Sequence, residues 1–208
     1  GLPEENLHVI TEGLDHEFYK PGGGKLVNPH VLYVGRLKRF KGVHFLIEAM
    51  RRVVQVLPNS KLLIVGRGEP EYERELKQLT KDLNLEDSVT FHGYVSEEEK
   101  IRFMQEAHVL VFPSQREGFG LVVIEANACG TPVVATHALG LRDSIIDGET
   151  GLLVAPYRSV KALAKMIVRV LADVGNRVVV LNFHIEWARR FSWDRTTEEF
   201  MKILECNK

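Results

Sequence analysis

The sequence predicts an α/β fold: a Rossmann-like, doubly wound parallel sheet of about six strands, followed by a helical C-terminal section. Two observations predict the sheet. Short runs of Val, Ile and Leu are continuous, as in strands buried on both faces. These runs alternate with stretches in which apolar residues recur about every 3.6 residues, the spacing of amphipathic helices. After residue 154 only the helical spacing remains, which predicts the C-terminal section.

The expected strands are Val31–Val34, Lys61–Val65, Ser88–Phe91, Val109–Phe112, Pro132–Ala135 and Leu152–Val154. The expected helices are Val43–Val56, Glu71–Leu83, Ser96–Ala107, Leu121–Ala128, Val160–Leu171, Arg177–Phe191 and Asp194–Cys206. Ser96 followed by Glu99 is a capping box, which predicts a helix start. Pro58 ends the helix that precedes it.

Three regions are expected along the chain: a linker segment over 1–30, the Rossmann-like domain over 31–173, and C-terminal helices packing on it over 174–208. The tract Pro21-Gly22-Gly23-Gly24 is typical of a flexible connection. Because the chain begins with Gly1, we expect it to be a piece of a longer protein.

Composition excludes several classes of protein. The 208 residues are 45% hydrophobic and 26% charged with a net charge of −1, which argues against disorder and against a nucleic-acid-binding surface. No apolar run is long enough for a membrane span, and no signal peptide is visible. Two cysteines far apart argue against a disulfide framework, so we expect a reducing compartment and a cytoplasmic protein.

In parallel sheets ligands bind beyond the carboxyl ends of the strands. Gly35, Gly66 and Gly93 follow three successive expected strands, which suggests close approach of the backbone to a ligand. The loop after the first strand also carries four cations, which favours a phosphate ligand. The alternative is that the glycines serve the turns and that Lys38 and Arg39 are solvated surface charges.

The most informative stretch surrounds the helix expected to begin near Leu121. Gly118 and Gly120 form a turn before it, and the free N–H groups of a helix start attract anions. Glu117 lies just outside this helix and Glu125 about one turn inside it. Carboxylates accept hydrogen bonds from vicinal hydroxyls, so each glutamate is expected to hold a sugar on one side of a diphosphate. Alternatively, Glu117 caps the helix electrostatically and Glu125 is a solvated residue.

Other ligand motifs are absent from the sequence. There is no G-x-G-x-x-G in the dinucleotide context and no G-x-x-x-x-G-K-[ST]. The eight histidines match no metal-ligand spacing, so no metal site is expected.

Residues 117–134 closely resemble the E-x7-E signature of family-four retaining glycosyltransferases, which have the GT-B architecture of two Rossmann-like domains. The segment 34–42 resembles the V-G-R-L…K-G motif of that family, 91–95 its F-x-G-x-V element, and 147–154 its D-G-x-T-G-x-L-V ending. The match runs in order from about Val9 to Ile203 and covers the C-terminal, donor-binding half. One departure is Leu139-Gly140, where the family has two glycines.

The resemblance implies roles for individual residues. Arg36 and Lys41 would hold the donor diphosphate and stabilise it as the leaving group, Glu117 would contact the transferred sugar, and Glu125 the ribose. Arg36, Lys41 and Glu117 are therefore the expected catalytic residues. The remaining expected donor-binding residues are Gly35, Gly66, Gly93, Tyr94, Val95, Gly118, Phe119, Gly120, Leu121 and Val122.

The resemblance also implies hexosyl transfer, with retention of anomeric configuration, from a nucleotide-diphosphate sugar to an unknown acceptor, with no cofactor required. The expected partners are the nucleotide-sugar and a missing N-terminal acceptor-binding domain, without which the isolated chain should have little or no activity. Peripheral membrane association of the full-length enzyme stays open. So do two alternatives, a non-catalytic nucleotide-sugar-binding module and half of a nucleotide-sugar 2-epimerase.

Overall fold

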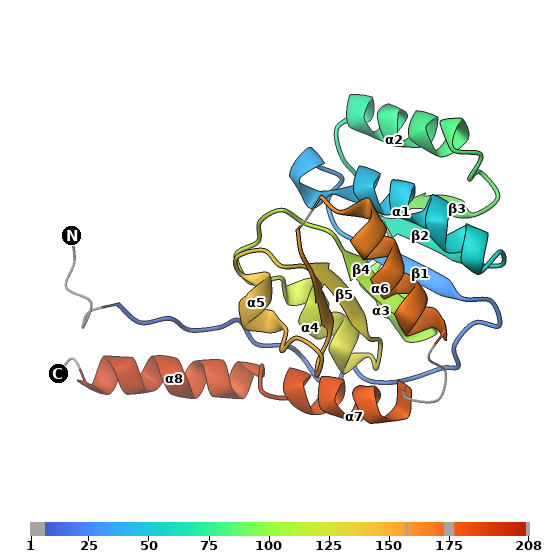
Figure 1. The fold of residues 1–208 in the computed structure, drawn as a ribbon. Helices are drawn as coiled ribbons and strands as arrows, with labels where there is room; N and C mark the ends of the chain where they lie inside the picture. Colours follow the sequence, from blue (N-terminus) through green and yellow to red (C-terminus); the bar gives the residue numbers. More distant parts are fainter. Residues whose placement is uncertain (1–6, 157, 173–176, 207–208) are drawn as a thin grey trace.

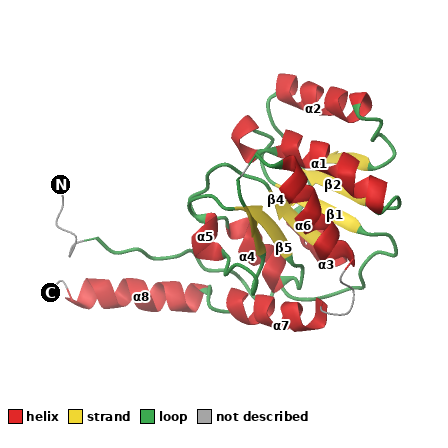
Figure 2. Cartoon of the chain, in the orientation of Figure 1, coloured by secondary structure: helices red, strands yellow, loops and turns green. Residues whose placement is uncertain are grey.

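The structure is a computed structural model that describes residues 7–156, 158–172 and 177–206. In these residues six strands form one parallel sheet (Figures 1 and 2), as the sequence predicts. The strand order, which the sequence does not predict, is β3-β2-β1-β4-β5-β6. The strands are β1 (His30–Val34), β2 (Lys61–Val65), β3 (Val89–Gly93), β4 (Val109–Phe112), β5 (Val133–Thr136) and β6 (Leu152–Val154).

Helices cover both faces of the sheet, which makes the fold doubly wound. α1 packs with α2 and α6 on one face, and α4 packs with α3 and α7 on the other (Figure 1). The helices are α1 (Val43–Val56), α2 (Pro70–Asp82), α3 (Glu97–Glu106), α4 (Leu121–Ala128), α5 (Leu141–Ser144), α6 (Val160–Ala172), α7 (Arg177–Ala188) and α8 (Trp193–Cys206), with the 3₁₀ turn η2 (Arg39–Lys41). η2 and α5 are short elements that the periodicity does not predict.

Three strands differ from expectation at their ends, since β1 also begins one residue earlier, at His30. β5 begins at Val133 because Pro132 has no N–H to donate to the ladder. β3 begins one residue later than expected and extends to Gly93. As an edge strand it alternates between buried and more exposed residues, unlike the fully buried β4.

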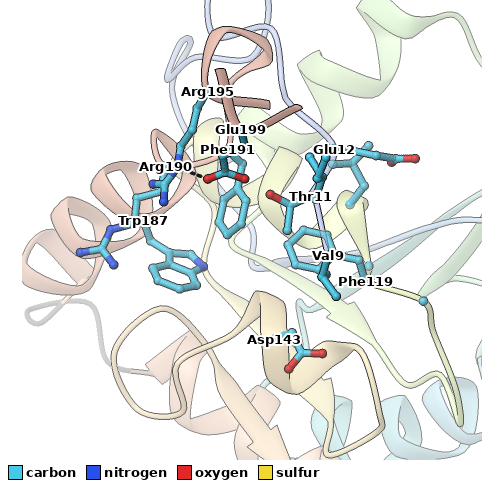
Figure 3. Close-up of a pocket in the computed structure, with 14 residues that line it drawn as sticks. Val9, Thr11, Glu12, Phe119, Asp143, Trp187, Arg190, Phe191, Arg195 and Glu199 are labelled. Carbon is cyan, nitrogen blue, oxygen red and sulfur yellow. Dashed lines mark hydrogen bonds and ion pairs between the residues drawn. The ribbon is translucent and has the colours of Figure 1, made fainter. Parts of the chain in front are cut away.

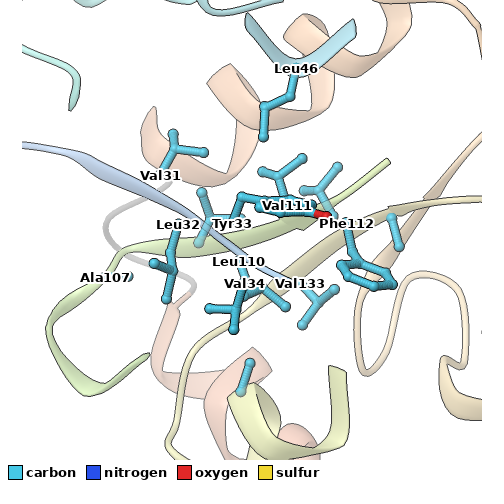
Figure 4. Packing of buried hydrophobic residues seen from close by; sticks show 14 of the residues in the cluster. Val31, Leu32, Tyr33, Val34, Leu46, Ala107, Leu110, Val111, Phe112 and Val133 are labelled. Carbon is cyan, nitrogen blue, oxygen red and sulfur yellow. The ribbon is translucent and has the colours of Figure 1, made fainter. Parts of the chain in front are cut away.

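The central strands form the apolar core of the sheet. In β1, Val31 and Leu32 point to opposite sides of the sheet, and Leu46 of α1 covers the side of Val31 (Figure 4). Tyr33 is fully buried and stacks on Phe112 of β4, with ring centroids 6.1 Å apart. Its hydroxyl donates to the Arg36 carbonyl oxygen at 3.0 Å, so the core fixes the start of the loop after β1.

The first part of the leading segment, residues 7–29, lies against the C-terminal section, and its later part lies against α3. The Leu14 amide donates to the Phe191 carbonyl at 3.0 Å, and the Thr196 hydroxyl donates to the Thr11 carbonyl at 2.9 Å. In Figure 1 the start of this segment and α8 run side by side beyond the sheet. The expected boundary between 173 and 174 falls outside the described residues, and the division into three regions stays a prediction.

Two further observations concern the whole described chain. None of its helices combines the length and the apolarity needed to cross a bilayer. Cys129 is a buried free thiol, and burial raises its pKa to about 12.

Candidate functional site

A cavity of about 320 Å³ lies at the carboxyl ends of β1 and β4. All three expected catalytic side chains line it, together with Glu125 and Lys100. Arg36 and Lys41 therefore converge on one space, as the sequence-based interpretation requires. The full lining is Val34, Gly35, Arg36, Lys41, Lys100, Phe112, Glu117, Gly120, Leu121, Val122 and Glu125.

The loop after β1 reaches the cavity because it packs tightly on the loop after β4. Gly42 has φ +72°, and a Cβ there would lie 2.2 Å from the Pro113 carbonyl oxygen. Only glycine allows this approach. Lys41 is buried at the end of the η2 turn, just before Gly42, whereas Arg36 lies earlier in the loop and is exposed. Lys41 is therefore held in place, and Arg36 is accessible.

Lys41 and Glu117 form an ion pair across these two loops. Their charged atoms are 2.5 Å apart, and the side chains are only 11% and 12% exposed. The Lys41 ammonium also lies 5.1 Å from the centroid of the Phe112 ring. Glu117 thus faces a cation of the cavity, and it does so from the turn that precedes α4.

Glu125 is paired with Lys100 of α3. The Lys100 Nζ atom lies 2.9 Å from Glu125 Oε2 and 2.6 Å from Glu97 Oε1. Glu125 is only 8% exposed, so the alternative that it is a solvated helix residue is wrong. Burial raises the pKa of Glu125, and the ammonium of Lys100 opposes that rise.

The start of α4 closes the cavity. Gly120 has φ +85°, and a Cβ there would lie 2.6 Å from a methyl carbon of Leu141. Gly140 has φ +81°, and a Cβ there would lie 2.3 Å from the Glu117 carbonyl oxygen. Of the two family glycines, the chain therefore keeps Gly140, which the contact with Glu117 requires. Leu139, which replaces the other glycine, is 69% exposed.

Six expected donor-binding residues lie outside the lining of this cavity: Gly66, Gly93, Tyr94, Val95, Gly118 and Phe119. A Cβ on Gly66 would lie 1.9 Å from the Gly35 carbonyl oxygen, so packing of the two loops already accounts for this glycine. Tyr94 is 78% exposed after the edge strand β3. A donor-binding role for these residues stays a prediction.

Gly118 and Phe119 line a second cavity of about 710 Å³. Figure 3 shows Thr11 and Glu12 of the leading segment on one side of it and Arg190 of the C-terminal section on the other. Gly120 and Leu121 line both cavities and separate them. No sequence signal predicts the larger cavity, because its walls come from opposite ends of the chain.

Of the remaining charges of the first loop, Arg39 is exposed as the surface alternative expects, whereas Lys38 is half-buried. Arg39 pairs with Glu75 at 2.5 Å, and both side chains are more than half exposed. Within 7–156, 158–172 and 177–206, no three His, Cys, Asp or Glu side chains gather as metal ligands would.

Comparison with known proteins identifies the family. Residues 18–180 match the model of the family described as glycosyl transferases group 1. A D-inositol 3-phosphate glycosyltransferase of Corynebacterium urealyticum is 32% identical over 214 residues, covering 95% of this chain and 50% of that protein. The chain thus spans about half the length of the curated relatives that it matches.

Solved structures agree with this match. The Anabaena protein HepE, in complex with UDP and glucose, aligns over 96% of this chain and 57% of its own with a TM-score of 0.85 and 26% identity. The C-terminal domain of the Francisella tularensis group 1 glycosyltransferase LpcC aligns over 86% of this chain and 97% of its own, with a TM-score of 0.77 and 25% identity. The resemblance found in the sequence is confirmed: the chain belongs to the group 1 glycosyl transferases and corresponds to a C-terminal domain of that family.

Proposed function

We propose that this chain binds the nucleotide-sugar donor of a retaining glycosyltransferase and that UDP is the nucleotide. The observation that carries the proposal is the 320 Å³ cavity, where Arg36 and Lys41 meet the start of α4 beside two carboxylates, the largely buried Glu117 and the buried Glu125. The structural neighbour that holds UDP and glucose supports the choice of nucleotide and sugar class.

The chemistry of each group suits a diphosphate. An ammonium has three N–H donors, so Lys41 can keep its bond to Glu117 and still donate to phosphate oxygens. Arg36 adds a planar pair of donors, and the amides at the start of α4 add partial positive charge. These groups stabilise the negative charge that develops on the departing diphosphate, while Glu117 accepts from sugar hydroxyls and Glu125 from ribose hydroxyls.

Transfer requires an acceptor as well as a donor. We propose that a second domain of the longer enzyme positions the acceptor, since correct positioning supplies roughly 7–11 kcal/mol of a reaction barrier. The chain alone then binds the donor and transfers little sugar. Acceptor and leaving group share one face of the donor sugar, which retains the anomeric configuration without a protein nucleophile or a metal cofactor. The enzyme is proposed to act in the cytoplasm.

Calorimetric titration of the chain with UDP tests the proposal, with one substitution in each cavity. Arg36→Gln removes an exposed guanidinium from the smaller cavity, and Arg190→Gln removes one from the larger cavity. A charge-assisted hydrogen bond contributes about 1.5–3 kcal/mol, so Arg36→Gln should weaken UDP about 10- to 100-fold and Arg190→Gln less than about 2-fold. Equal losses in both variants, or no binding of UDP, GDP or ADP at millimolar concentration, would contradict it.

A further inference from the structure

We propose that Lys100 is a positioning residue: its ammonium holds the Glu125 carboxylate in the orientation in which that carboxylate accepts hydrogen bonds from the ribose of the donor. The inference rests on the proposed function and deepens it. It adds a residue from α3, outside the segments whose motifs mark the site.

The first step is the placement of Lys100 at the binding edge. The hydroxyl oxygen of Ser96 accepts from the Glu99 amide at 3.2 Å, and the Glu99 carboxylate accepts from the Ser96 amide at 3.2 Å. This capping box fixes where α3 begins, directly after β3, and Lys100 follows in the next turn. Its side chain is 16% exposed and lines the cavity with Glu125.

The second step is the way in which the ammonium is held. Lys100 contacts Glu125 on one side and Glu97 on another, at 2.9 Å and 2.6 Å. The Tyr19 ring of the leading segment supplies a third side, with its centroid 5.1 Å from Nζ, and the Tyr19 hydroxyl donates to Glu97. Residues from three segments thus immobilise a side chain that is ordinarily flexible.

The third step is what this does to Glu125. Lys100 engages Oε2, which orients the carboxylate plane and directs Oε1 to a ribose hydroxyl. Burial by itself favours the protonated carboxyl and raises the pKa of Glu125, and a protonated carboxyl is a poorer acceptor. Burial also lowers the pKa of Lys100, but Glu125 and Glu97 raise it by more, so the ammonium stays charged.

A purely structural ion pair between α3 and α4 would also explain the contact, and the ribose hydroxyls separate the two roles. UDP and 2′,3′-dideoxy-UDP are titrated into wild type, Lys100→Met and Glu125→Gln. Arg102→Met, on the exposed face of α3, is the matched control.

We expect wild type to prefer UDP about 10-fold over the dideoxy analogue, the effect of one charge-assisted hydrogen bond from a ribose hydroxyl to Glu125. Lys100→Met and Glu125→Gln should abolish this preference, lowering UDP affinity about 10-fold and dideoxy-UDP affinity less than about 2-fold. Arg102→Met should retain the preference. Equal weakening of both ligands by Lys100→Met, or no change in either, overturns the inference and leaves the Arg36 result untouched.

Tyr19→Phe provides a second variant that keeps the ring and removes only the hydroxyl bonded to Glu97. It should reduce the UDP preference about 2- to 3-fold, the effect of one net hydrogen bond acting at a distance. An unchanged preference in Tyr19→Phe together with an unchanged one in Lys100→Met contradicts the proposal. If wild type itself shows no preference, the ribose role of Glu125 fails as well.

Discussion

The two cavities share the wall formed by Gly120 and Leu121, yet the charged pair of one is largely buried and that of the other is more exposed. The smaller, of about 320 Å³, holds Lys41 and Glu117 as a pair that is about nine-tenths buried. The larger, of about 710 Å³, has Arg195 and Glu199 as a pair that is 58% and 35% exposed. Burying charge is costly unless it is paired, and functional sites are where such costs accumulate. Buried paired charge, rather than volume, therefore distinguishes the smaller cavity, which is the proposed binding site.

The sharpest test of this contrast is the stability of two matched variants. Lys41→Met leaves the Glu117 carboxylate buried without its cation, and breaking such a pair costs about 3 kcal/mol. Arg195→Met breaks an exposed pair on α8 and should cost less than about 0.5 kcal/mol. Urea unfolding of both variants at neutral pH measures the difference. Similar losses in the two variants would mean that burial of the first pair carries no energetic weight.

Acid should act on the side of the larger cavity, through His184 of α7. The ring is fully buried, no hydrogen-bond partner for either nitrogen is found among the described residues, and burial lowers its pKa to about 4. Between pH 6.5 and 4 the unfolded chain therefore binds a proton that the folded chain does not, and stability falls as pH falls. The loss should approach roughly 3 kcal/mol.

The measurement compares the free energy of unfolding of wild type and His184→Leu at pH 6.5 and at pH 4.5. Because the other titrating groups are common to both proteins, the difference between them isolates His184. Wild type should lose roughly 2–3 kcal/mol more than the variant. Parallel losses in the two proteins would show that this ring is not the acid-sensitive group.

The smallest effect tests whether the shared wall couples the cavities. Phe191 packs on Phe119 and Trp187, with ring centroids 5.2 and 5.3 Å away. Phe191→Leu should lower stability by about 1 kcal/mol, as a modest change of shape in a packed site does. It should change UDP affinity less than about 2-fold. A larger loss of affinity, measured by the same calorimetry, would show that the aromatic cluster holds the turn before α4 in its binding geometry.

The sequence predicts those parts of the site that depend on local pattern. Continuous apolar runs identify β1 and β4, and the turn before Leu121 places Glu117 and Glu125 at the same sheet edge. The pairing of Lys41 with Glu117 joins residues 76 positions apart, and no periodicity encodes it.

Lys100 is not among the site residues expected from the sequence, although the sequence carries a signal that places it at the sheet edge. The capping box at Ser96 fixes the start of α3, and the first turns of a helix after a parallel strand lie at the carboxyl edge of the sheet. Lys100 lies in α3, a few residues beyond the loop that follows β3, so the loops at the sheet edge do not include it. The larger cavity offers no comparable signal, because residues near the two ends of the chain, such as Thr11 and Arg190, line it together only after folding.

The start of the leading segment lies beside α8, where Thr196 bonds to Thr11, and Leu14 bonds to Phe191 just before α8. This arrangement sets the path of mechanical load. Tension applied between the two ends of the described chain would first peel these segments apart, one contact at a time. The force would reach the strands only afterwards, so these contacts protect the sheet from force applied at either end.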